Sequence, residues 1–412
     1  MSARRIDLVE AAAFGGAVLF VVCLYTSPPY LIPATAVLRP AMLGATLMLG
    51  GVVLRRVLRG TPLRLGGGVG AAMVLLFSFA LLSALWAFSP HDAVAFFFGT
   101  IKLLFAYVGI VGALSSPRRI RKLMEVAAFA SVIPAIGTLQ RYHDGVGLVE
   151  GFRGTWIGLL ANPNQLAMVM AVTLPWALLS ALWARGAKRL LLLGAVGLQC
   201  ATIVVTHSRG GALGMAMALV AFAIFAERRV QALALVGLLA AAVAVFAPKS
   251  FWQRTETIGA YQVDASAQDR IRSWETGLAA FEDHPLLGIG AGGYLHAWDR
   301  YQPRNVREKA YASHNMWMQV VVELGAIGTL LFATMIALML RGLWRARRSE
   351  EYGREARALL ASFTALVVCG STAGYAFNWF FYMALGVAGA VVAGARRSEA
   401  RERAHVVGFA LA

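Results

Sequence analysis

The residues that could do chemistry fall in four short polar segments between long apolar runs, at residues 151–170, 206–214, 266–294 and 311–325. Together these segments supply arginines, a histidine, and several amides and aromatic rings. They contain no cluster of His, Asp or Glu with metal-ligand spacing and no DxD-type carboxylate pair. Arginines without a metal suit a polyanionic group, which they can clamp bidentately. A histidine suits the deprotonation of a hydroxyl.

The segment 206–214, THSRGGALG, places Arg209 in a turn that is too short to be a free loop. Arg209 is therefore expected at the boundary between membrane and water, where Gly210 and Gly211 allow close backbone approach. A cation held at such a boundary needs an anionic partner or a watery cavity. The alternative is an arginine that snorkels at a helix end.

The segment 266–294 carries Arg270 and Arg272 on a predicted helix that ends at His284-Pro285. Four apolar side chains recur at helical spacing and should form one face: Ile271, Trp274, Leu278 and Phe281. Arg270 lies about 60° from the centre of that face and Arg272 about 140° away. Arg270 is therefore the better candidate for a protein-lined site, unless both arginines are solvated. The glycines of GIGAGG have no strand–helix unit around them, so they predict a tight turn.

The segment 311–325, YASHNMWMQVVVELG, places His314 where an outer loop enters an apolar run. Ser313 is expected to cap the helix, with His314 and Asn315 in its first turn. An imidazole there can accept a proton near neutral pH, as a general base must. The alternative is an interfacial histidine without a role. Glu323 lies about 180° around the helix from His314, so we expect it to be a buried hydrogen-bonding group.

The segment 151–170 contributes Arg153, a further cation, and a polar turn. Asn162-Pro163-Asn164 is a turn-and-cap signal, which explains most of this pattern. Asn164 and Gln165 could also bind a sugar or a phosphate at the mouth of a helix bundle.

The apolar runs between these segments predict a membrane protein. Of the 412 residues, 59% are hydrophobic and 14% are charged, whereas a soluble chain carries about a quarter charged residues. This composition excludes an ordinary cytosolic enzyme and a disordered protein. Because a membrane helix needs about 20 apolar residues, we predict an all-α polytopic fold with about 12 transmembrane helices. The runs lie near residues 9–25, 36–54, 68–88, 94–115, 122–140, 162–183, 189–206, 210–226, 230–247, 314–340, 357–377 and 379–394.

Basic residues gather at both termini and in every second gap between the runs, which predicts cytoplasmic termini. The net charge of +17 is therefore a topology signal and not a sign of nucleic-acid binding. The outer gap at residues 248–313 has eight basic and eight acidic residues and many aromatics, as a small folded domain would. We thus expect helices 1–9 in residues 1–247, an outer domain at 248–313, and helices 10–12 with a cytoplasmic tail in 314–412.

These polar segments all belong to the outer side, so their chemistry predicts transfer from a lipid pyrophosphate to a hydroxyl acceptor. The motifs SRGG, then R-x-x-x-W with HPLLGIGAGGY, then HN-x4-VVELG, resemble the O-antigen ligase and polymerase superfamily over roughly residues 150–330. The resemblance implies a GT-C-type membrane glycosyltransferase of the bacterial inner membrane with a periplasmic active site. It implies an undecaprenyl-pyrophosphate-linked glycan as donor, the lipid A–core oligosaccharide as acceptor, and an inverting reaction with no metal and no cofactor.

The resemblance also implies roles for individual residues. His314 matches the family's essential histidine, as general base on the acceptor hydroxyl. Arg209 and Arg270 match the arginines that bind the pyrophosphate and stabilise the leaving group. Further residues are expected to contact donor or acceptor: Arg272, Arg153, Asn162, Asn164, Gln165, Asn315 and Tyr311.

Three other functions compete with the ligase. A sister polymerase would use the same donor and add the glycan to another lipid-linked repeat. A protein O-oligosaccharyltransferase usually carries a longer C-terminal region. A transporter of lipid-linked glycan predicts polar groups near the bilayer midplane and internal repeats. The polar groups here gather at one interface, which favours an enzyme.

Overall fold

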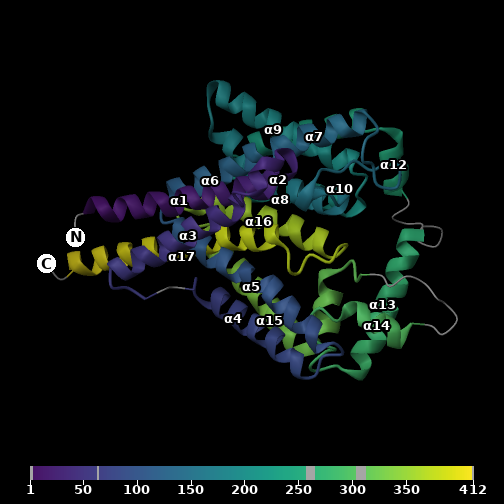
Figure 1. Ribbon diagram of the computed structural model, residues 1–412. Helices are drawn as coiled ribbons and strands as arrows, with labels where there is room; N and C mark the ends of the chain where they lie inside the picture. The colour runs from purple at the N-terminus through teal and green to yellow at the C-terminus, as the bar shows by residue number, and fades with distance from the viewer. Residues whose placement is uncertain (1–2, 63–64, 257–264, 303–311, 411–412) are drawn as a thin grey trace.

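The computed structural model describes residues 3–62, 65–256, 265–302 and 312–410 (Figure 1). Every regular element in these ranges is a helix, which confirms the all-α fold. Ten helical segments are long and apolar enough to cross a membrane, so the chain is a multi-pass membrane protein. An eleventh apolar helix, α10, has 17 residues. A twelfth, α16, starts with the polar sequence GREAR, and most of its residues are buried against its neighbours.

All twelve predicted runs coincide with helices. The fifth run is divided at Ser131 into α6 and α7, and the last two helices are separated by residues 371–378. The helices are α1 (Ala3–Thr26), α3 (Pro40–Leu58), α4 (Gly68–Leu82), α5 (Pro90–Ala113), α6 (Pro117–Ala130), α7 (Val132–His143), α8 (Pro163–Trp183), α9 (Gly186–Val205), α10 (Arg209–Phe225), α11 (Arg229–Phe246), α15 (Met316–Ala346), α16 (Gly353–Gly370) and α17 (Trp379–Ala410).

The bundle has a buried centre and an exposed edge. α8 is buried along most of its length and packs against α9, α10 and α16. α11 is apolar but almost entirely exposed, with Val230, Leu233 and Phe246 all open to the surroundings. An apolar helix with so little protein contact belongs at the lipid-facing edge, because exposing its apolar side chains to water would be unfavourable.

The two ends of the bundle differ in what they carry. Both chain termini lie at one end, and the helices α12 (Lys249–Glu256), α13 (Ala265–Asp283) and α14 (Tyr294–Tyr301) lie beyond the other (Figure 1). The four polar segments also meet at the end that carries α12–α14. Segment 266–294 forms α13, segment 311–325 is hydrogen-bonded to α13, and segment 206–214 shares a groove with α12. Segment 151–170 directly follows Glu150, which pairs with Arg254 of α12.

The long helix α15 is interrupted at Gly325, whose backbone has φ 62° and ψ −164°. The loop 285–290 docks into this break: the Ile289 N–H donates to the Val322 carbonyl at 3.0 Å, and the Gly290 N–H donates to the Glu323 carbonyl at 2.9 Å. The GIGAGG segment therefore forms the predicted turn, and the VVELG segment supplies the backbone that receives it. Glu323 is buried, as expected, and lies near the backbone amides of Gly292 and Tyr294.

We expect Gly325→Ala to lower the free energy of unfolding by about 3 kcal/mol, because only glycine adopts this backbone conformation without strain. A Cβ atom at this position would also meet the Leu286 carbonyl oxygen and lie 2.6 Å from the Gly288 nitrogen. Thermal unfolding of the purified variant in detergent measures the effect. Gly237→Ala is the control, since a Cβ at Gly237 in α11 meets nothing within 4 Å. Equal melting temperatures for both variants would contradict this account of the break.

The buried face of α13 differs from the prediction. Small side chains face inward, at Ser273, Thr276, Gly277 and Ala280, whereas Leu278 is 49% exposed. The reason is the close approach of the neighbouring segments: the Tyr294 hydroxyl lies 2.8 Å from where a Gly277 Cβ would be. The predicted apolar face at Ile271, Trp274, Leu278 and Phe281 was therefore wrong as the packing face.

Candidate active site

His314 lies between Ser313, whose carbonyl is hydrogen-bonded to α13, and Asn315, which caps α15. Its backbone is left-handed, with φ 44°, so it stands outside the helix. Asn315 caps α15, because its side-chain oxygen accepts hydrogen bonds from Trp317 N (2.9 Å) and Met318 N (3.3 Å). The prediction that Ser313 caps the helix and that His314 occupies its first turn was wrong. Because His314 has a left-handed backbone, the helix begins at Met316, later than the sequence pattern indicated.

The helix α13 is fixed against the backbone that precedes His314. The Trp274 indole N–H donates to the Ser313 carbonyl at 2.7 Å, and the Ser273 hydroxyl donates to the Ala312 carbonyl at 3.1 Å. The Tyr294 hydroxyl of α14 in turn donates to the Ser273 carbonyl at 2.9 Å. These bonds hold the R-x-x-x-W helix and the histidine in one unit, so a group on α13 can act on His314.

The charge of Arg270 acts on His314. The pKa of His314 is lowered, chiefly because burial disfavours the charged imidazolium and also because the Arg270 guanidinium lies nearby. Asp269 opposes this shift. The imidazole therefore stays neutral, and able to accept a proton, to a lower pH than an ordinary histidine. Arg272 is exposed, as predicted.

Arginines from separate segments share this region. Burial lowers the pKa of Arg153, Glu150 opposes the shift, and the positive charges of Arg254 and Arg270 add to it. Arg153, Arg254 and Arg270 are thus close enough for their charges to interact, although they come from a loop, from α12 and from α13. Such a group of guanidinium ions favours an anionic ligand.

A hydrogen-bond network joins the Arg153 loop to the start of α10. The side-chain oxygen of Asn164 accepts from Arg153 Nη2 at 2.6 Å and from Ser208 Oγ at 2.8 Å. Arg153 Nε donates to the Thr206 carbonyl at 3.0 Å. Ser208 caps α10 by accepting from Gly211 N at 3.2 Å. The network fixes the turn from which Arg209 extends.

Arg209 is the first residue of α10, next to the capping Ser208. The glycines that follow it allow tight packing, as predicted, because a Cβ at Gly211 would collide with Ala167 of α8. Arg209 also lines an apolar groove of about 390 Å³ between α10, α11 and α12. Beyond Arg209, the groove is lined by apolar residues: Ala212, Leu213, Met215, Ala216, Leu219, Val220, Val236, Leu239, Ala240, Val243, Phe251 and Trp252.

The remaining predicted contact residues have different positions. Asn162 caps α8, because its side-chain oxygen accepts from Asn164 N at 2.9 Å and from Gln165 N at 3.3 Å. Gln165 is partly exposed at the same end of α8. Tyr311 lies outside the described residues. The structure thus brings together Arg153, Asn164 and Ser208 by direct bonds, and Arg270 and His314 by charge.

Three residues of this region were missed by sequence reasoning. Arg254 of α12 forms an ion pair with Glu150 at 3.2 Å, and Glu150 also pairs with Arg153 at 3.2 Å. Tyr375, in the turn between α16 and α17, is buried and lies close enough to Arg153 and Arg270 for their charges to act on its hydroxyl. The one available signal was composition: a tyrosine in a short polar turn, and an acidic residue three positions before an arginine.

Within the described part of the chain, no group of three or more His, Cys, Asp and Glu side chains is arranged to hold a metal ion.

Two comparisons bear on this site. The family model described as O-antigen ligase matches residues 193–333, which include α10, α13 and His314. An O-antigen ligase from Pseudomonas aeruginosa is 28% identical over 347 residues, covering 79% of this chain and 77% of its own length. The chain is therefore similar to O-antigen ligases, both in the region around this site and over most of its length. This similarity supports a membrane-embedded, glycosyltransferase-like enzyme. The matched region contains Arg209, Arg270 and His314 but not Arg153.

Proposed function

We propose that this protein is an O-antigen ligase. It transfers a glycan from undecaprenyl pyrophosphate to a sugar hydroxyl of the lipid A–core oligosaccharide. The observation that carries the proposal is the 2.7 Å hydrogen bond from Trp274 to the Ser313 carbonyl, which joins the helix of Arg270 to the backbone of His314 within the matched region. A base beside a group of arginines is what a pyrophosphate donor and a hydroxyl acceptor require.

In the proposed reaction the imidazole of His314 takes the proton of the acceptor hydroxyl. The hydroxyl oxygen attacks the anomeric carbon, so a glycosidic bond forms while the bond from that carbon to the pyrophosphate oxygen breaks. The electron pair leaves with the undecaprenyl pyrophosphate, and the anomeric configuration inverts. Arg209 and Arg270 stabilise the charge on the leaving group, because fixed guanidinium ions act most strongly where charge develops. Arg153 and Asn164 add donor contacts.

The polyprenyl chain of the donor is proposed to occupy the apolar groove beside Arg209. The groove begins at a cation and continues over apolar side chains of α10 and α11. α11 is exposed along the edge of the bundle, so a lipid can enter sideways from the bilayer. This arrangement puts a charged end next to an apolar channel, which matches a pyrophosphate attached to a long hydrocarbon chain.

The location follows from the same proposal. The protein lies in the bacterial inner membrane with both termini in the cytoplasm, as the basic gaps indicate. The end that carries α12–α14 is then periplasmic, and residues 248–313 form the periplasmic domain between the ninth and tenth transmembrane helices.

An O-antigen polymerase is the second candidate, because it uses the same donor and the same kind of base. Purified protein supplied with donor, lipid A–core acceptor and EDTA distinguishes the candidates. The ligase predicts a product in which glycan is attached to lipid A–core, with undiminished yield in EDTA. Longer lipid-linked glycan from donor alone would identify a polymerase. No product with either acceptor would overturn both assignments, and strong inhibition by EDTA would overturn the metal-independent reaction.

The pH dependence of transfer should carry the signature of His314. The base works in its neutral form, so kcat/KM rises with pH as the imidazole loses its proton. Because burial and Arg270 lower the pKa of His314, the midpoint of this rise should lie below 6.5. Arg270→Gln removes a positive charge, raises the pKa and moves the midpoint to higher pH. A midpoint that stays in place in this variant would contradict the proposed pairing.

A further inference from the structure

A second arginine-rich site lies at the opposite end of the bundle, where the two termini are (Figure 1). There a cavity of about 560 Å³ opens between α3, α5 and α17. We name it the arginine cavity. Its charged lining residues are Glu10, Arg55, Arg56, Arg59, Arg396, Arg397 and Arg401. Its volume lies within the range of about 300–1,000 Å³ that is usual for small-molecule sites.

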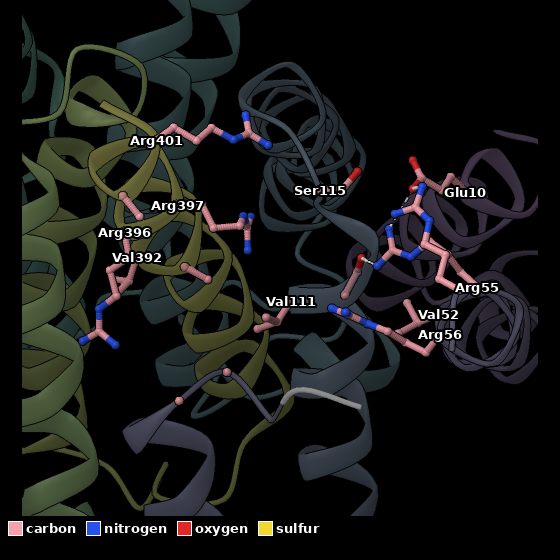
Figure 2. A pocket seen from close by; sticks show the side chains of 16 residues that line it. Glu10, Val52, Arg55, Arg56, Val111, Ser115, Val392, Arg396, Arg397 and Arg401 are labelled. Atoms are coloured by element: carbon pink, nitrogen blue, oxygen red, sulfur yellow. Dashed lines mark hydrogen bonds and ion pairs between the residues drawn. The ribbon is translucent and has the colours of Figure 1, made fainter. Parts of the chain in front are cut away.

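The arginines come from two helices that face each other across the cavity. Figure 2 shows Arg55 and Arg56 beside Glu10 on one side, and Arg397 and Arg401 reaching from α17 on the other. Glu10 is the only acidic residue among the described residues that line the cavity. Its carboxylate already pairs with Arg59 at 3.0 Å, and with Arg55 and Arg119 at 3.3 Å each. One carboxylate therefore faces six arginines in the lining.

A smaller cavity of about 230 Å³ adjoins the first and shares Gly66 and Arg396 with it. It adds Arg341 and Arg345 of α15 to the basic surface. Gly66 and Gly68 lie at the start of α4, whose positive dipole end adds to the field there. Two adjoining basic cavities suit a ligand with two anionic groups.

Membrane topology alone accounts for arginines at this end, but it does not account for their arrangement. Arg185 and Arg189 serve topology equally well from exposed positions at the start of α9, and they line neither cavity. In contrast, Arg55 is only 7% exposed and donates to the Gly112 carbonyl at 2.8 Å. Glu10 and the Gly112 carbonyl account for Arg55, but one carboxylate does not balance the remaining arginines around the same space. Bringing these positive charges together is costly unless an anion occupies that space.

We propose that the two cavities bind a phosphate-bearing anion with two phosphate groups. Guanidinium ions bind phosphate bidentately, and basic pockets between membrane helices are suited to lipid headgroups. A diphosphate headgroup of an anionic lipid and a soluble pyrophosphate share this chemistry. This site lies at the opposite end from His314, so binding there does not depend on the proposed transfer reaction.

Native mass spectrometry of the full-length protein in detergent tests the proposal, with cardiolipin as the diphosphate lipid and phosphatidylethanolamine as the comparison. We expect Arg397→Gln with Arg401→Gln to weaken cardiolipin binding roughly 25-fold, at about fivefold for each arginine near a membrane surface. Both side chains are exposed, so the variant should fold like the wild type. The variant with Arg397→Lys and Arg401→Lys keeps the positive charge, so its affinity for cardiolipin should fall much less.

The control variant is Arg185→Gln with Arg189→Gln, which removes the same charge from the same end without touching a cavity. It should bind cardiolipin as the wild type does. Thermal unfolding with inorganic pyrophosphate identifies the source of the anion. A soluble ligand is supported if pyrophosphate stabilises the wild type but not the Arg397→Gln, Arg401→Gln variant, and if the wild type shows no preference for cardiolipin. Equal losses in the control, or no difference between wild type and the cavity variant with either probe, would overturn the proposal.

Discussion

Replacing His314 with alanine is expected to reduce glycan transfer by about 10²–10⁴-fold, the range that a general base contributes. The acceptor hydroxyl cannot attack effectively until a group removes its proton. His314 lies outside the helix that follows it, and burial and the Arg270 charge lower its pKa, which favours the neutral imidazole. Transfer to lipid A–core by the purified variant, measured at saturating donor, reports the loss in kcat.

The fold and the donor site should survive this change. His314 is not the cap of α15, since Asn315 has that role, so removing the imidazole leaves the helix start intact. His143→Ala is the matched control, because that histidine is exposed at the same end of the bundle. Wild-type activity in His314→Ala, with the control also active, would refute the assignment of the base. Loss of donor binding would instead assign His314 to the pyrophosphate.

Arg270→Ala is expected to reduce kcat by about 10²–10³-fold, the effect of removing a group that stabilises developing charge. Arg272→Ala should change it less than about threefold, because an exposed charge contributes little. The two residues are neighbours on one helix, so this pair separates a specific contact from a general loss of positive charge. Steady-state kinetics of both variants at matched salt concentration gives the comparison.

In the structure, the expected difference between Arg270 and Arg272 does not rest on the helix-face argument used for the sequence. The apolar face from which the arginine angles were measured is not the packing face of α13. Arg270 is singled out instead by the effect of its charge on the pKa values of His314 and Arg153. A larger loss in Arg272→Ala than in Arg270→Ala would refute the assignment of the leaving-group contact.

Local patterns in the sequence predicted those parts of the fold that depend on near neighbours. Apolar length predicted the helices, and Asn162-Pro163-Asn164 predicted the start of α8. Gly210 and Gly211 predicted a close approach, which α8 and residue Thr372 provide. Each of these features is decided within a few residues of the pattern itself, so one sequence is enough to reveal it.

Features that join distant segments could not be predicted in the same way. The bonds from Asn164 to Arg153 and to Ser208 link residues 11 and 44 positions apart. The position of Tyr375 near Arg153 depends on how α16 and α17 turn at the same end of the bundle. The inward face of α13 depends on the approach of Tyr294, which favours small side chains over bulky ones. These contacts are determined by how distant segments pack together, and the spacing of residues along one helix does not describe that packing.

A structure of the protein bound to undecaprenyl pyrophosphate tests the central claim most directly. Two arginine-rich sites lie at opposite ends of the bundle, and the proposed reaction uses only the one that contains His314. We expect the pyrophosphate to contact Arg209 and Arg270, with its polyprenyl chain in the groove between α10 and α11. A pyrophosphate bound in the arginine cavity beside Glu10, with the His314 site left empty, would contradict the account.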